Sequence, residues 1–158
     1  MAVRRSTLWR VPVFCAVAGW VSWYATIWLG RYFYVVTEMG ADGTPIVSAD
    51  PVRSGIFSIV LFILLLLAGG LWFLRGMTRK EIAVSAGIAS AMYLLLLLGQ
   101  MLLPELLGFA VIGISMIQNW TVMGTNWLWR LVGSASSWMS VLMPFLFVPF
   151  GRRAESEA

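Results

Sequence analysis

The residues that could bind a ligand in this chain are neutral amides, with one acid and one base nearby. They follow or end the third apolar stretch and comprise Gln100, Glu105, Gln118, Asn119, Asn126 and Arg130. Amides donate and accept hydrogen bonds without carrying charge, so they can line a polar pocket inside an apolar protein. Glu105 and Arg130 would lie at the rim of that pocket. This arrangement requires the segment after Pro104 to fold back.

Ser90, Tyr93 and Gln100 share one face of the third apolar stretch if that stretch is helical, because their offsets are three and seven residues. Hydrogen bonds between helices are the favoured interpretation of this face. The alternative is the polar pocket, open to the outer leaflet.

The sequence offers no pattern of catalytic or metal-binding residues. It has no histidine and one cysteine, which excludes a histidine-based triad, a zinc site with histidine ligands and an intramolecular disulfide. Cys15 is expected to be a small buried residue. Glu38, Asp42 and Asp50 lack the spacing of a calcium-binding loop, so a solvated loop is favoured. We expect no catalytic residue, no metal and no cofactor.

The elements that must position the amides are membrane-spanning helices. Of 158 residues, 60% are hydrophobic and 11% charged, whereas soluble proteins have about a quarter charged. An outer loop at 31–54 can form a short surface hairpin. The fold class we expect is an all-α integral membrane protein, a four-helix bundle forming a single membrane domain over 1–158. Its predicted spans are residues 11–30, 55–75, 79–103 and 131–150.

Local signals mark the boundaries of the second and third helices. Asp50 is a suitable N-cap before Pro51 at the first helical position, and Gly76 is placed to end the second helix. Thr78 and Glu81 form the T-x-x-E pattern of a capping box. These two helices should therefore form a tight antiparallel hairpin.

The basic residues predict how the bundle is oriented. Lysine and arginine are retained on the cytoplasmic side of short loops. With four spans, Arg31, Arg53 and Arg130 lie outside, which leaves eight of the 11 basic residues inside. Both termini are then cytoplasmic, and we expect a bacterial-type plasma membrane.

Residues 105–130 leave the number of spans open. Their apolar part, 106–117, would be about 18 Å long as a helix, shorter than a hydrocarbon core of about 30 Å. This length is more typical of a re-entrant or interfacial helix than of a span. The alternative is one crossing by residues 106–129, which gives five spans and leaves seven of the 11 basic residues inside. The charge asymmetry favours four spans.

Tryptophans form a further pattern, since most fall in the predicted outer half of the bundle. An interfacial aromatic belt is the favoured interpretation. The alternative is an aromatic surface or cage for a lipid, a peptide or a quaternary ammonium group. The tryptophans concerned are Trp20, Trp23, Trp28, Trp120, Trp127, Trp129 and Trp138.

Small residues recur every four positions on two predicted helices. Such faces let helix backbones approach closely in lipid. Packing within the chain is favoured, and docking onto another membrane protein or self-association is the alternative. The first face comprises Ala18, Ser22, Thr26 and Gly30, and the second comprises Ala83, Gly87 and Ala91.

These features together predict a membrane protein that works with partners. The formal charge is +4, and the basic residues lie beside the apolar stretches. Membrane topology and binding to anionic lipids explain these residues better than binding to nucleic acid does. We expect a non-enzymatic accessory or assembly partner of other membrane proteins. The alternatives are a small transporter or channel subunit with an uncharged polar and aromatic pathway and, third, a lipid-modifying enzyme.

Overall fold

Three long helices make up most of the molecule, and all three are long and apolar enough to cross a membrane by length and composition. They are α1 (Arg10–Phe33), α2 (Pro51–Ala68) with its π-helical extension η2 (Gly69–Phe73), and α3 (Arg79–Leu102). Each is about 35 Å long at ~1.5 Å per residue, enough for a hydrocarbon core of about 30 Å. The structure, a computed structural model, describes residues 7–102, 110–126, 129–133 and 135–153.

These helices turn most of their apolar side chains outward. In the most apolar 18-residue window, only 28% of α1, 17% of α2 with η2 and 33% of α3 is buried. A helix of a soluble protein faces a core with one apolar stripe and water with the rest. A helix in lipid has an apolar environment on every side. The chain therefore has the surface of a membrane protein.

Both predicted helix starts are confirmed. The Asp50 carboxylate accepts hydrogen bonds from the N–H groups of Val52 and Arg53 at 2.9 and 3.1 Å. At the start of α3, the Thr78 N–H donates to the Glu81 carboxylate at 3.0 Å, and the Glu81 N–H donates to the Thr78 hydroxyl at 3.3 Å. These bonds satisfy amide hydrogens that the first turn of a helix leaves unpaired.

The end of the second helix differs from the prediction. We expected Gly76 to end it, but the helix widens into η2 and ends at Phe73. The Leu74 N–H donates to the Gly69 carbonyl at 2.9 Å, which is the five-residue spacing of a π-helix. Gly76 does not have the positive φ of a glycine at a helix end. The π-turn therefore takes the place of a glycine cap.

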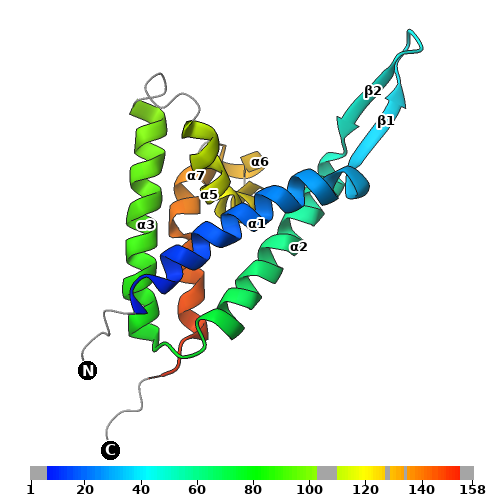
Figure 1. The fold of residues 1–158 in the computed structure, drawn as a ribbon. Helices are drawn as coiled ribbons and strands as arrows, with labels where there is room; N and C mark the ends of the chain where they lie inside the picture. Colours follow the sequence, from blue (N-terminus) through cyan, green and yellow to red (C-terminus); the bar gives the residue numbers. More distant parts are fainter. Residues whose placement is uncertain (1–6, 103–109, 127–128, 134, 154–158) are drawn as a thin grey trace, which may run out of the picture.

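Strands β1 (Val35–Met39) and β2 (Pro45–Ala49) form an antiparallel hairpin between α1 and α2. Figure 1 shows the hairpin projecting beyond the ends of these two helices. The predicted outer loop thus contains a small sheet, and the fold is mostly helical, not entirely so.

The predicted fourth span, residues 131–150, is not one continuous helix. Helix α6 (Trp129–Val132) is followed by Gly133, whose φ of +57° lies in the left-handed region that favours glycine. The chain continues as α7 (Ala135–Leu142) and the 3₁₀ helix η4 (Met143–Phe150). The apolar run alone could not reveal this break, because it contains no charge or long polar segment.

The 3₁₀ geometry of η4 changes the length of the final segment. Pro144 and Pro149 cannot donate backbone hydrogen bonds, which disfavours a regular α-helix here. The 8 residues of α7 span about 12 Å and the 8 residues of η4 span about 16 Å, because a 3₁₀ helix rises ~2.0 Å per residue. Their sum of about 28 Å approaches the thickness of a hydrocarbon core, about 30 Å.

Helix α5 (Ala110–Thr125) occupies the region predicted to be re-entrant or interfacial. Its 16 residues span about 24 Å, less than any of the three long helices. It packs most extensively against α1 and also contacts α2, α3 and α7. In Figure 1 it lies toward the end of the molecule at which α3 finishes. The segment is therefore part of the bundle.

Hydrogen bonds hold the start of α1, the α2–α3 turn and the end of η4 together. The Arg152 N–H donates to the Met77 carbonyl at 3.1 Å, and the Arg79 N–H donates to the Arg152 carbonyl at 3.1 Å. We call these two bonds the clasp. The Val11 N–H of α1 donates to the Ser85 hydroxyl of α3 at 3.2 Å. Three regions far apart in the sequence thus meet at one end of the bundle.

The described basic residues fall into two groups at opposite ends of the bundle, as the sequence predicts. Arg31 ends α1 and Arg53 begins α2, so both lie beside the hairpin at the opposite end from the clasp. Arg130 belongs to α6, but its side chain lies outside the described residues. The described basic residues at the clasp end are Arg10, Arg75, Arg79, Lys80, Arg152 and Arg153.

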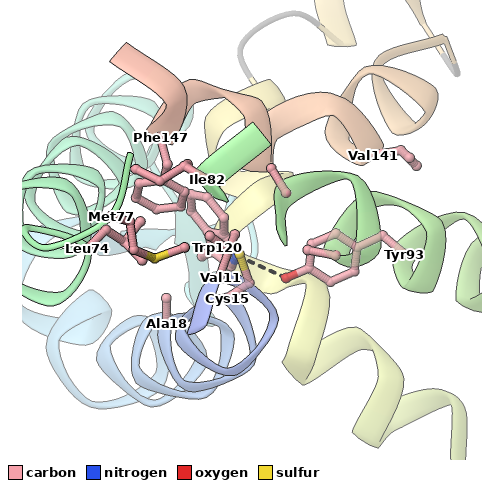
Figure 2. Close-up of a cluster of buried hydrophobic side chains, with 12 residues drawn as sticks. Val11, Cys15, Ala18, Leu74, Met77, Ile82, Tyr93, Trp120, Val141 and Phe147 are labelled. Atoms are coloured by element: carbon pink, nitrogen blue, oxygen red, sulfur yellow. Dashed lines mark hydrogen bonds between the residues drawn. The ribbon is translucent and has the colours of Figure 1, made fainter. Parts of the chain in front are cut away.

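Trp120 lies at the centre of the core, which corrects its assignment to an interfacial belt. Its side chain is 0% exposed and stacks on Phe62 of α2, with ring centroids 5.5 Å apart. The indole N–H donates to the Tyr93 hydroxyl at 3.0 Å, as Figure 2 shows. Phe147 of η4 also packs on this indole, with its centroid 5.6 Å away. One residue of α5 therefore joins α2, α3 and η4.

The other described members of the predicted belt lie nearer the surface. Trp20, Trp28 and Trp138 are 54%, 62% and 46% exposed; their place at the membrane interface stays a prediction. Trp23 is half-buried. Trp127 and the side chain of Trp129 lie outside the described residues.

The small-residue face of α1 packs closely against α5. Ala18 and Ser22 are buried, and Thr26 is half-buried. Gly30 is buried too, but it lies against the side chain of Tyr34. A Cβ added to Gly19, one position from the predicted stripe, would lie 2.6 Å from the carbonyl carbon of Ile117 and still nearer its oxygen. Only glycine allows this approach of two backbones.

The predicted small-residue face of α3 does not pack within the described chain at Gly87 and Ala91, which contradicts the favoured interpretation there; docking onto another membrane protein or self-association stays a prediction. Ala91 is exposed, and a Cβ added to Gly87 would have nothing within 4 Å. The buried positions of α3 are instead Glu81, Ile82, Ser85, Ala86, Ala89, Ser90 and Tyr93. Both sides of this helix are apolar or small, so the pattern could not identify the side that packs.

Candidate functional site

A polar pocket lies between four helices at the end of the bundle opposite the clasp. Its volume is about 300 Å³, and α1, α3, α5 and α7 all contribute to its wall. Two larger hollows of about 560 and 450 Å³ are lined mainly by apolar side chains of the outer surface. The polar pocket is lined by Trp23, Leu97, Gln100, Ser115, Gln118, Asn119, Val122, Ser137 and Ser140.

Three of the six predicted ligand-binding residues meet in this pocket. Gln100 comes from the last turn of α3, and Gln118 and Asn119 come from the middle of α5. The fold-back that the sequence required is therefore present, because α5 returns beside α3 and α1. Whether the pocket binds a ligand stays a prediction.

The other three predicted residues are not among the described residues that line the pocket. Asn126 follows α5 and is exposed. Glu105 and the side chain of Arg130 lie outside the described residues. The charged rim formed by Glu105 and Arg130 therefore stays a prediction.

Two of the pocket amides are held by neighbouring helices. The Asn119 side-chain N–H₂ donates to the Ser22 hydroxyl of α1 at 2.9 Å. The Gln118 side-chain N–H₂ donates to the Tyr93 carbonyl of α3 at 3.4 Å. These bonds fix the orientation of both side chains and satisfy one donor on each amide.

Sequence reasoning missed the serines of α7 and the tryptophan of α1 that complete the wall. Ser137 and Ser140 lie three residues apart, which places them on one face of a helix. That spacing was a usable signal, but it points to a pocket only when the facing helix is known. Trp23 was grouped with the interfacial belt, although it reaches the pocket.

The hairpin is the second candidate site, because it is almost entirely exposed. Nine of its ten strand residues are exposed, and only Val36 is half-buried. The register places alternate side chains on opposite faces. One face, which we call the apolar face, comprises Val35, Thr37, Met39, Pro45, Val47 and Ala49.

Hydrogen bonds at its two ends identify the free edges of the hairpin. The backbone N–H of Gly40 donates to the Thr44 carbonyl, and the backbone N–H of Asp50 donates to the Tyr34 carbonyl, both at 2.8 Å. The even-numbered residues of β1 therefore direct their backbone groups toward β2. The odd-numbered residues point their N–H and C=O groups outward. On β2, Pro45 has no N–H to offer, which protects that edge. On the β1 edge, Val35, Thr37 and Met39 each have a backbone N–H that can donate a hydrogen bond.

The turn of the hairpin is fixed by Asp42. Its carboxylate accepts hydrogen bonds from the Thr44 hydroxyl at 2.6 Å and the Thr44 N–H at 3.1 Å. These bonds, first the hydroxyl and then the amide, lower the pKa of Asp42. Asp50 caps α2, so two of the three loop acids have local structural roles.

Comparisons with protein-family models, with curated proteins and with solved structures find no match to this chain.

Proposed function

We propose that this chain is a non-enzymatic accessory or assembly partner of other membrane proteins, and that the hairpin contacts the partner. The observation that carries the proposal is the uncovered apolar face of the hairpin. Met39 is 77% exposed, Val47 is 68% exposed and Val35 is 38% exposed. An element whose whole apolar face is uncovered within the described chain is suited to contact another molecule.

The energetics of the hairpin support a partner. An isolated two-stranded hairpin is at best marginally stable in water. The β1 edge presents the unpaired backbone groups of Val35, Thr37 and Met39 beside the apolar face. A partner with an extended apolar segment could pair with this edge and cover the face together. We therefore propose an extended protein segment on the hairpin side of the membrane as the partner.

Photo-crosslinking from adjacent residues tests this proposal. A photoreactive amino acid at Val47 lies on the apolar face, and one at Ser48 lies on the opposite face as a matched control. We expect one discrete protein adduct in cells from position 47, at several times the yield from position 48. The Val47→Glu variant should lose the copurifying partner, whereas Ser48→Glu should keep it.

Two outcomes would contradict the proposal. Equal protein adducts from both faces would mean that the contact is not specific. Adducts with lipid alone at position 47 would place the apolar face on the bilayer surface.

We further propose four crossings of a plasma membrane, with both termini in the cytoplasm. The grouping of basic residues at the clasp end supports this orientation. The final segment of about 28 Å is long enough for a fourth crossing, whereas α5, at about 24 Å, is short for one. The clasp also supports an even number of crossings, because it joins the α2–α3 turn to the end of η4.

Labelling of single cysteines tests the orientation. In a Cys15→Ser background, a cysteine replaces either Asp42, in the hairpin turn that precedes α2, or Gly76, in the turn that follows η2. We expect a membrane-impermeant maleimide to label position 42 in intact cells and position 76 only after permeabilisation. The reverse pattern would invert the orientation, and labelling of both in intact cells would contradict a spanning α2.

A further inference from the structure

The polar pocket has hydrogen-bonding capacity that the described protein does not use. The Gln100 amide makes no hydrogen bond within the described residues, and neither do the side-chain carbonyl oxygens of Gln118 and Asn119. The Ser137 hydroxyl is also unused there. Donors and acceptors left unpaired in an apolar environment are costly. Their convergence on one pocket therefore favours a polar occupant.

The chemistry of the described part of the wall favours a neutral group. None of the described residues that line the pocket is charged. An ion in an apolar region needs a charge partner to offset its desolvation. Amides and hydroxyls instead match groups that both donate and accept hydrogen bonds, as alcohols do.

The size and position of the pocket restrict the occupant further. About 300 Å³ is the lower end of the range for small-molecule sites, about 300 to 1,000 Å³. Trp23 lines the pocket, and an indole is a ring against which the carbon face of a sugar can pack. Gln100 is two residues from the end of α3, so the pocket lies near the level of lipid headgroups.

We propose that this pocket binds a neutral polyhydroxylated group, a single sugar or a glycerol unit. The group is either the headgroup of an uncharged glycolipid or a free polyol that enters from the hairpin side. Gln100 and Ser137 donate to its hydroxyls, and the oxygens of Gln118 and Asn119 accept from them. This site is independent of the accessory role, since it shares no residue with the hairpin.

Binding to lipid nanodiscs tests the proposal with the full chain. The discs contain phosphatidylcholine with monoglucosyl diacylglycerol, or with plain diacylglycerol as the matched control that lacks the sugar. Native mass spectrometry counts the lipids retained by the protein. Radiolabelled methyl glucoside and glycerol, added to discs of phosphatidylcholine alone, test the free polyol.

We expect selective retention of the sugar-bearing ligand and a loss of it in the Gln100→Leu variant. Loss of one or two neutral hydrogen bonds should weaken binding about 3- to 20-fold. This substitution removes no hydrogen bond of the described protein, so the fold should persist. Met101→Leu, on the same turn but 60% exposed, is the control and should bind as the unmodified chain does.

Each arm of the experiment decides a point. Retention of glucosyl lipid without binding of free sugar identifies a lipid headgroup, and binding of free sugar or glycerol identifies a solute. Equal retention of the sugar lipid and plain diacylglycerol, together with no binding of methyl glucoside or glycerol, would overturn the proposal. An unchanged affinity in the Gln100→Leu variant would overturn it too.

Discussion

Replacing Trp120 with alanine should lower the free energy of unfolding by about 3 kcal/mol, the low end of the range for such truncations in a core. The low end applies because, when the unmodified protein unfolds, the indole of Trp120 is exposed to detergent or lipid and not to water. The loss arises from the cavity left between Phe62 and Phe147 and from the hydrogen bond to Tyr93. Unfolding in mixed micelles titrated with sodium dodecyl sulfate measures it.

Two further variants separate these contributions. Trp120→Phe keeps the aromatic packing but removes the indole N–H, so it should cost about 1 kcal/mol. Trp72 is 84% exposed, so Trp72→Ala should change stability by no more than about 0.5 kcal/mol. Similar losses in Trp120→Ala and Trp72→Ala would show that Trp120 is not the centre of the core.

Replacing Gly19 with alanine should destabilise the bundle by about 1 to 3 kcal/mol, although it adds a single methyl group. The new Cβ would meet the backbone of Ile117 and, at 2.7 Å, the carbonyl oxygen of Met116. Backbone atoms cannot turn away as a side chain can, so α1 and α5 must separate. Separation would also lengthen the hydrogen bond between Asn119 and Ser22. The same unfolding titration measures the loss.

Gly87→Ala is the matched control for this prediction. Gly87 lies within α3, and its added Cβ would have nothing within 4 Å. Alanine forms helices better than glycine by about 0.8 to 1.0 kcal/mol, so this variant should be neutral or more stable. A loss of stability in Gly87→Ala as large as in Gly19→Ala would mean that the close approach of α1 to α5 is not what matters.

The sequence predicts the three long helices well because their signals are local. Uninterrupted apolar runs set their lengths, and Asp50 and Thr78 mark starts that hydrogen bonds confirm. The last segment was harder to predict. Gly133 and the two prolines of η4 divide it, but their effect depends on backbone angles that an apolar run does not specify.

The packing of the helices could not be predicted with the same success. In a soluble protein the apolar side of a helix marks the core, but in lipid both sides are apolar. Trp120 therefore resembled an interfacial residue, and Gly87 resembled a packing residue. The convergence of Gln100, Gln118 and Asn119 was predictable because polar side chains are rare in these helices and avoid contact with lipid, so they face the interior of the bundle.

The clasp has a consequence for the order in which the protein is made. A chain grows from its N-terminus, so α1, α2 and α3 are synthesised well before Phe147 and Arg152. Phe147 covers one side of Trp120, and Arg152 completes the clasp with Met77. Until those residues have been synthesised, the earlier helices lack the partner that closes their core. The native bundle therefore cannot close before Phe147 and Arg152 have been synthesised, and the earlier helices lack those contacts until then.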